Sequence, residues 1–177
     1  MSKTDSQANS AFRLSGTALV VLLGLFLIVF AKAPSVIRVI PYGWPEWSLI
    51  LSIYLAFRAE IWLASLGAFF LGSFNEALSL TPSGMEPLTL IILVISLSFF
   101  SKYLKFHHFL YLSLLFLLLF VFKNLFFIPG FLGIMDAFPG HGLENLSFNL
   151  ASRAVSTALI GPLLHLFLDY ILLRDNR

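Results

Sequence analysis

The chain has 177 residues, of which 59% are hydrophobic and 11% are charged. About a quarter of the residues in a typical soluble domain are charged, so this composition excludes an ordinary soluble domain and, with the long uncharged runs, indicates an integral membrane protein. A formal charge of +2 gives no basis for nucleic-acid binding, and the lack of cysteine excludes disulfides and thiolate metal sites.

The first apolar run covers about 14–33 and follows a polar segment, 1–13, that we expect to be a cytoplasmic tail. A cleaved signal peptide is the alternative, because Ala31-Lys32-Ala33 resembles a small-x-small cleavage site. The 18 uncharged residues from 14 to 31 exceed the apolar core of about 7–15 residues in a signal peptide. We therefore predict a retained first membrane helix.

Five further apolar segments follow, at about 45–57, 60–78, 87–101, 107–128 and 150–173. A helix needs about 20 residues to cross the hydrocarbon core, and the first, third, fifth and sixth of the six segments are long enough. The second and fourth are shorter, so they either cross with help from interfacial Trp and snorkelling basic side chains or form re-entrant segments. We predict an all-α membrane protein with about six transmembrane helices in one bundle, 14–173, and a C-terminal tail, 174–177.

The segment between the last two predicted helices is rich in turn-forming residues. Pro129-Gly130 and Pro139-Gly140 interrupt it, and Asn and Asp residues lie between and after them. We expect an extramembrane loop here, with a short interfacial helix around 131–138.

Lysine and arginine set the expected orientation, because cytoplasmic loops carry an excess of these residues. With six crossings and the N-terminus inside, the outer side carries only Lys32 and Arg38, with Arg153 near the boundary. The inner side then carries Lys3, Arg13, Arg58, Lys102, Lys105, Arg174 and Arg177. Both termini are therefore predicted to be cytoplasmic.

Small residues form one face of the third segment. Ala64, Ala68 and Gly72 recur every four residues, and Gly67 widens the face. Membrane helices approach closely where side chains are small. This face either packs inside the bundle or docks a membrane helix of a partner.

Charged side chains within the apolar segments are the other candidate site residues. Glu76 and Lys123 lie at similar predicted depths on the third and fifth segments, and a charge in hydrocarbon is tolerated when it is paired. We predict that these two residues approach one another, with Asn124 nearby as a hydrogen-bonding partner. The pair either fixes the register of the helices or takes part in proton or ligand binding.

The last segment carries His165 and Asp169 one helical turn apart, as a His–carboxylate couple or as simple packing residues. His107 and His108 are expected in the lipid headgroup region. The sequence contains no HExxH zinc motif, Gly-x-Ser-x-Gly elbow or Walker phosphate loop, so we predict no enzyme activity, cofactor or metal site.

Three stretches resemble the MreD family of bacterial rod-shape-determining proteins. Residues 45–58 resemble the Pro-acidic-apolar start of that family's second helix. The second stretch, 67–88, resembles a Gly-x-x-x-acid helix end followed by a glycine turn, here with Gly72, Glu76 and Gly84. The third, 156–174, resembles the last helix and includes Thr157 and Pro162. Glu76 stands where the family more often has Asp, and Glu86-Pro87 replaces a milder pair.

The resemblance implies a non-enzymatic scaffold of the cell-wall elongation machinery in the bacterial inner membrane. Such a protein would bind an MreC-like membrane protein and, through it, the MreB filament, RodA and the elongation transpeptidase. The implied fold is similar to the S components of energy-coupling-factor transporters. An S-component-like subunit that binds a vitamin or another small molecule is therefore the alternative, with Glu76, Lys123 and Arg153 as candidate ligand-binding groups.

Overall fold

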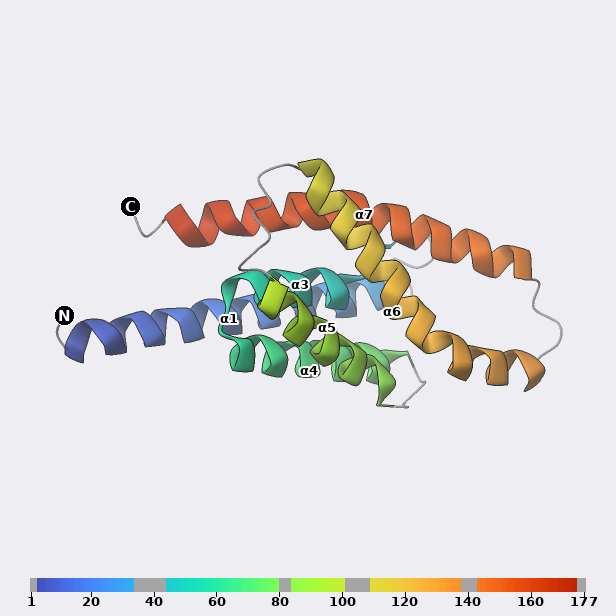
Figure 1. Ribbon diagram of the computed structural model, residues 1–177, viewed down its shortest axis with the longest axis horizontal. Helices are drawn as coiled ribbons and strands as arrows, with labels where there is room; N and C mark the ends of the chain where they lie inside the picture. Colours follow the sequence, from blue (N-terminus) through green and yellow to red (C-terminus); the bar gives the residue numbers. More distant parts are fainter. Residues whose placement is uncertain (1–2, 34–43, 80–83, 101–108, 138–142, 175–177) are drawn as a thin grey trace. The chain divides into compact units, whose positions relative to one another are not determined.

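The computed structural model describes residues 3–33, 44–79, 84–100, 109–137 and 143–174 (Figure 1). Every regular element in these ranges is an α-helix, which confirms the predicted all-α class. The helices are α1 (Lys3–Lys32), α3 (Trp47–Arg58), α4 (Ile61–Leu78), α5 (Met85–Phe100), α6 (Phe109–Ala137) and α7 (Leu143–Arg174).

Among the residues that the structure describes, three helical stretches are long and apolar enough to cross a membrane: Ser15–Lys32, Ile61–Leu78 and Leu150–Leu172. Three shorter apolar stretches, Trp47–Arg58, Met85–Phe100 and Phe109–Asn124, belong to α3, α5 and α6. The predicted number of six crossings stays a prediction. Many large apolar side chains on these helices are exposed, including Leu22 at 67%, Leu110 at 78% and Phe167 at 57%, as expected for a surface that faces lipid.

The helices at the two ends of the chain and around the predicted loop are longer than predicted. α1 begins at Lys3 instead of about residue 14, because the polar segment before it is itself helical. α6 continues through Pro129-Gly130 to Ala137, and α7 begins at Leu143 instead of about residue 150. Proline lacks one backbone donor and usually kinks or ends a helix, but apolar residues continue on both sides of Pro129-Gly130 and the helix continues with them.

The described residues divide into two compact units, and the single bundle expected from the sequence stays a prediction. Unit 1 joins Met1–Phe30 with Trp47–Lys105. Within it, α3 packs against α4 and α5, and α4 packs against α5 (Figure 1). All nine residues from 48 to 56 are buried, which is typical of a helix that is apolar on every side. α3 is therefore a core helix of the fold.

Unit 2 joins Ala31–Glu46 with Phe106–Arg177, and its main contact is between α6 and α7. Gly161 lets α7 approach α6 closely, because a Cβ atom added there would lie 2.7 Å from a ring carbon of Phe116. The Phe116 side chain is completely buried. Pro162, which lies inside α7, directly follows this contact.

Candidate functional site

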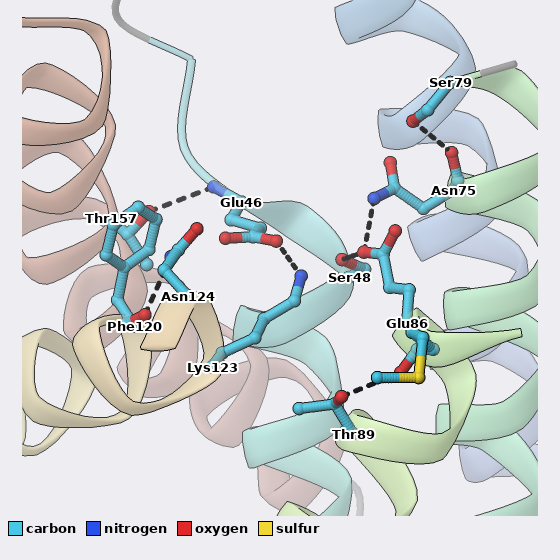
Figure 2. A network of polar contacts seen from close by, with 11 residues as sticks. Glu46, Ser48, Asn75, Ser79, Glu86, Thr89, Phe120, Lys123, Asn124 and Thr157 are labelled. Atoms are coloured by element: carbon cyan, nitrogen blue, oxygen red, sulfur yellow. Dashed lines mark hydrogen bonds and ion pairs between the residues drawn. The ribbon is translucent and has the colours of Figure 1, made fainter. Parts of the chain in front are cut away.

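An acidic residue just before α3 organises the polar contacts of unit 2. The Glu46 carboxylate accepts a charged hydrogen bond from the Lys123 ammonium of α6, and the two side chains point toward one another in Figure 2. The backbone N–H of Glu46 also donates to Thr157 Oγ1 of α7 at 3.0 Å. Glu46 therefore ties α6 and α7 together through two different groups.

The burial of this ion pair decides what it does for stability. Glu46 is 7% exposed, Lys123 is 3% exposed and Thr157 is completely buried. Removing one partner of a buried ion pair leaves a charge without compensation and costs about 3–5 kcal/mol. The pair therefore stabilises the fold when both residues are present. Either residue without its partner would destabilise it.

The partner found for Lys123 differs from the predicted one. We predicted Glu76, whereas the described ion pair is made with Glu46, 77 positions away in the sequence. Glu76 belongs to unit 1 and Lys123 to unit 2, so their approach stays a prediction. Asn124, expected beside the charge pair, donates its side-chain Nδ2 to the Phe120 carbonyl oxygen of its own helix at 2.8 Å.

A second set of polar contacts lies in unit 1 around Glu86, in the first turn of α5. Glu86 Oε1 accepts hydrogen bonds from Ser48 Oγ of α3, at 3.2 Å, and from Asn75 Nδ2 of α4 (Figure 2). Both Ser48 and Glu86 are buried, at 1% and 7% exposure. One carboxylate oxygen therefore joins all three of the helices α3, α4 and α5.

Glu76 fixes the turn between α4 and α5. Its Oε1 accepts a hydrogen bond from the backbone N–H of Gly84 at 2.7 Å. Gly84 has φ of +70°, a left-handed conformation that glycine adopts without steric cost. The acidic residue predicted at the end of the third segment therefore closes a helix hairpin.

The small-residue face of α4 is occupied inside unit 1. Ala64 and Ala68 are completely buried. A Cβ atom added to Gly67 would lie 2.6 Å from a Leu55 side-chain carbon, and one added to Gly72 would lie 2.6 Å from the Pro87 Cα atom. All four residues of this face are buried among the described residues, as internal packing requires, and docking of a partner helix stays a prediction.

Three of the predicted polar residues, Arg153, His165 and Asp169, lie on α7. His165 Nε2 lies 3.8 Å from Asp169 Oδ2, an ion-pair distance that is too long for a hydrogen bond. Arg153 is exposed and lies one turn before Thr157 on the same helix. Across the described residues, no group of three or more His, Asp or Glu side chains could hold a metal ion. His107 and His108 lie outside the described residues.

The sequence interpretation missed Glu46 and Glu86 as centres of polar contacts. A signal was present, because each stands next to a proline at the start of an apolar helix, as Pro45-Glu46 and Glu86-Pro87. A carboxylate at this position is stabilised by the positive end of the helix dipole. No sequence pattern indicated which side chains donate hydrogen bonds to these two carboxylates, because the donors lie on other helices.

No protein-family model, curated protein or solved structure matches this chain. The resemblance to the MreD family stays a prediction from the sequence. What the chain's own geometry provides is two sets of buried polar contacts, each centred on a carboxylate at a helix start and each joining helices within one unit.

Proposed function

We propose that this chain is a non-enzymatic scaffold in the inner membrane of a bacterium, where it belongs to the cell-wall elongation machinery. It binds an MreC-like membrane protein and helps to position peptidoglycan synthesis. Contact with the MreB filament, RodA and the elongation transpeptidase is indirect. Both termini lie in the cytoplasm, and six helices cross the membrane in a fold similar to that of energy-coupling-factor S components.

The observation that carries this proposal is where the polar contacts fall in the sequence. Each of the three stretches that resemble the MreD family contributes to them: Glu46 in the first, Glu76 with Gly84 in the second, and Thr157 in the third. These side chains bond to other parts of the same chain and so hold helices in place. Contacts that fix the arrangement of helices suit a scaffold, which has to present a constant surface to its partners.

The short helices are compatible with a membrane-spanning scaffold. α3 has 12 residues, or about 18 Å of helix, against a hydrocarbon core of about 30 Å. Because residues 48–56 are all buried, the protein surrounds this helix and its length need not match the lipid. A short crossing inside the protein is therefore our interpretation of α3.

Co-purification tests the proposal. The tagged full-length chain would be expressed in its natural host, solubilised in a mild uncharged detergent and captured, and the bound proteins identified by mass spectrometry. We expect an MreC-like protein in about the same amount as the chain, with wall-synthesis enzymes in smaller amounts. A tagged membrane protein of similar size and unrelated function is the control for detergent-driven association.

Two results would contradict the scaffold proposal. Recovery of an ATPase pair with a coupling membrane subunit would identify a transporter S component instead. Depletion of the chain from a rod-shaped host provides a second readout, since loss of an elongation scaffold should make the cells round. Rod shape that persists after complete depletion would refute the assignment to wall elongation.

A further inference from the structure

The corner between α3 and α4, residues 58–62, places charged side chains next to an exposed aromatic ring. α3 ends at Arg58 and α4 begins at Ile61, and both Arg58 and Glu60 are exposed. Trp62, in the first turn of α4, is 57% exposed. Its indole Nε1 donates a hydrogen bond to Glu60 Oε2 at 2.9 Å. The polar edge of this ring is therefore directed toward the charged end of the corner.

The exposed side of α4 beyond Trp62 is apolar. Leu66, Phe69 and Phe70 are all exposed, and their spacing from Trp62 places the four residues on one side of the helix. The stretch Ile61–Leu78, which contains them, is long and apolar enough to cross a membrane. The exposed surface therefore changes from charged to apolar within two helical turns, and Trp62 lies at the change.

A lipid bilayer presents the same order of environments. Its hydrated headgroups lie directly outside a hydrocarbon core of about 30 Å. Tryptophan is enriched at this boundary because its ring is apolar whereas its N–H needs a hydrogen-bond acceptor. The contact between Trp62 and Glu60 meets both needs, since the acceptor lies on the charged side and the exposed ring continues into the apolar side of α4.

We propose that the α3–α4 corner lies in the headgroup layer of the membrane, with Trp62 at the boundary and Leu66, Phe69 and Phe70 in contact with acyl chains. α4 has 18 residues, or about 27 Å of helix, which nearly matches the hydrocarbon core. The turn that the Glu76–Gly84 hydrogen bond closes then lies near the opposite boundary. This placement is independent of the scaffold function, and it requires only that the chain lies in a membrane.

Fluorescence quenching by brominated lipids tests the placement. The full-length chain with Trp44→Phe and Trp47→Phe keeps Trp62 as its one tryptophan. It would be reconstituted in phosphatidylcholine vesicles whose acyl chains carry bromine either near the headgroup or near the chain end. We expect the shallow bromine to quench Trp62 more strongly than the deep one.

A second readout avoids the substitutions at Trp44 and Trp47, whose indole Nε1 atoms are buried in the fold. The quenching profiles of the wild-type chain and of Trp62→Phe would be measured in the same vesicles, and their difference reports Trp62 alone. Circular dichroism would verify that every variant keeps its helix content.

Phe70→Trp, in a chain whose three natural tryptophans are replaced by phenylalanine, is the matched control. Phe70 lies on the same exposed side of α4, eight residues after Trp62. Its quenching profile should place it about 12 Å deeper than Trp62. Equal depths at the two positions, or a greater depth for Trp62, would overturn the placement. Failure of both lipids to quench Trp62 would overturn it as well, because protein would then cover the corner.

The role of Glu60 in orienting the indole has its own test. Glu60→Ala should lower the fluorescence anisotropy of Trp62 in the single-tryptophan chain, because the hydrogen bond to Oε2 is lost. Glu60→Gln keeps an acceptor oxygen and should retain most of the anisotropy. Equal anisotropy in all three chains would show that Glu60 does not orient the ring.

Discussion

Replacing Lys123 with methionine should destabilise the folded chain strongly, because it would leave the Glu46 carboxylate buried without its cation. Glu46 is 7% exposed and Lys123 is 3% exposed, so water reaches neither group. Breaking a buried pair from one side costs about 3–5 kcal/mol. Removing both charges together, in Glu46→Gln with Lys123→Met, should restore most of that loss. The sum of the two single losses should therefore exceed the loss of the double variant by at least about 3 kcal/mol.

The assay is a double-mutant cycle on the purified full-length chain. Wild type, both single variants and the double variant would be unfolded in mixed micelles with increasing SDS, and the helix signal followed by circular dichroism. Glu60→Gln is the control, because Glu60 is exposed and its carboxylate accepts a hydrogen bond from Trp62 Nε1 at 2.9 Å. A change at such a surface site is usually within about 0.5 kcal/mol.

Additive losses from the two single variants would refute the Glu46–Lys123 pair. A second cycle, with Glu76→Gln in place of Glu46→Gln, tests the pairing that the sequence predicted. Coupling of Lys123 to Glu76, with none to Glu46, would mean that the sequence-based pairing is right and the described contact is wrong. Coupling to Glu46 alone would leave Glu76 its role in the α4–α5 turn.

Three further predictions concern the packing of unit 1, and unfolding in SDS measures each of them. Gly72→Ala should cost about 1–3 kcal/mol, because its Cβ would lie 2.6 Å from the Pro87 Cα atom; Gly16→Ala, which has nothing within 4 Å of the added atom, is the control and should cost nothing. Gly84→Ala should cost about 1–2 kcal/mol because of its positive φ, although the space around it is open; wild-type stability in this variant would argue against the left-handed turn. Ala68→Leu should cost at least about 1–3 kcal/mol by overpacking a completely buried position, and an unchanged unfolding curve would contradict the internal packing of this face.

The sequence predicted helices well where apolar runs were uninterrupted. α3, α4 and α5 begin and end within about two residues of the segments 45–57, 60–78 and 87–101. The spacing of Ala64, Ala68 and Gly72 predicted a face of close helix packing, and all three residues are buried. It could not show what packs there, because the neighbours of this face come from other helices, such as Leu55 in α3 and Pro87 in α5.

Proline and glycine in the region 129–149 were a poor guide to where the helices end and begin. Pro129-Gly130 indicated a helix end, but α6 passes through it. Backbone propensity is a weak guide when long apolar stretches on both sides favour one continuous helix. The loop predicted between the last two helices was therefore too long, because α6 continues to Ala137 and α7 already begins at Leu143.

The partners of buried charges were the least predictable feature, and this follows from how the two polar sets are built. Each set of polar contacts contains a carboxylate next to a proline at the start of a helix: Glu46 before α3 and Glu86 in the first turn of α5. The helix dipole favours a negative charge at both places, which is a local effect that the sequence can indicate.

The donors that complete each set come from elsewhere in the fold. Lys123 is 77 positions from Glu46, and Ser48 is 38 positions from Glu86. The sequence favoured Glu76 by depth and charge, whereas the described partner is Glu46, so the choice between them depends on how the helices pack. Because each donor belongs to a different helix from its carboxylate, the polar contacts can form only when the packing is correct. In both units, then, the same buried groups that would be costly in a misfolded chain favour the one arrangement in which they are bonded.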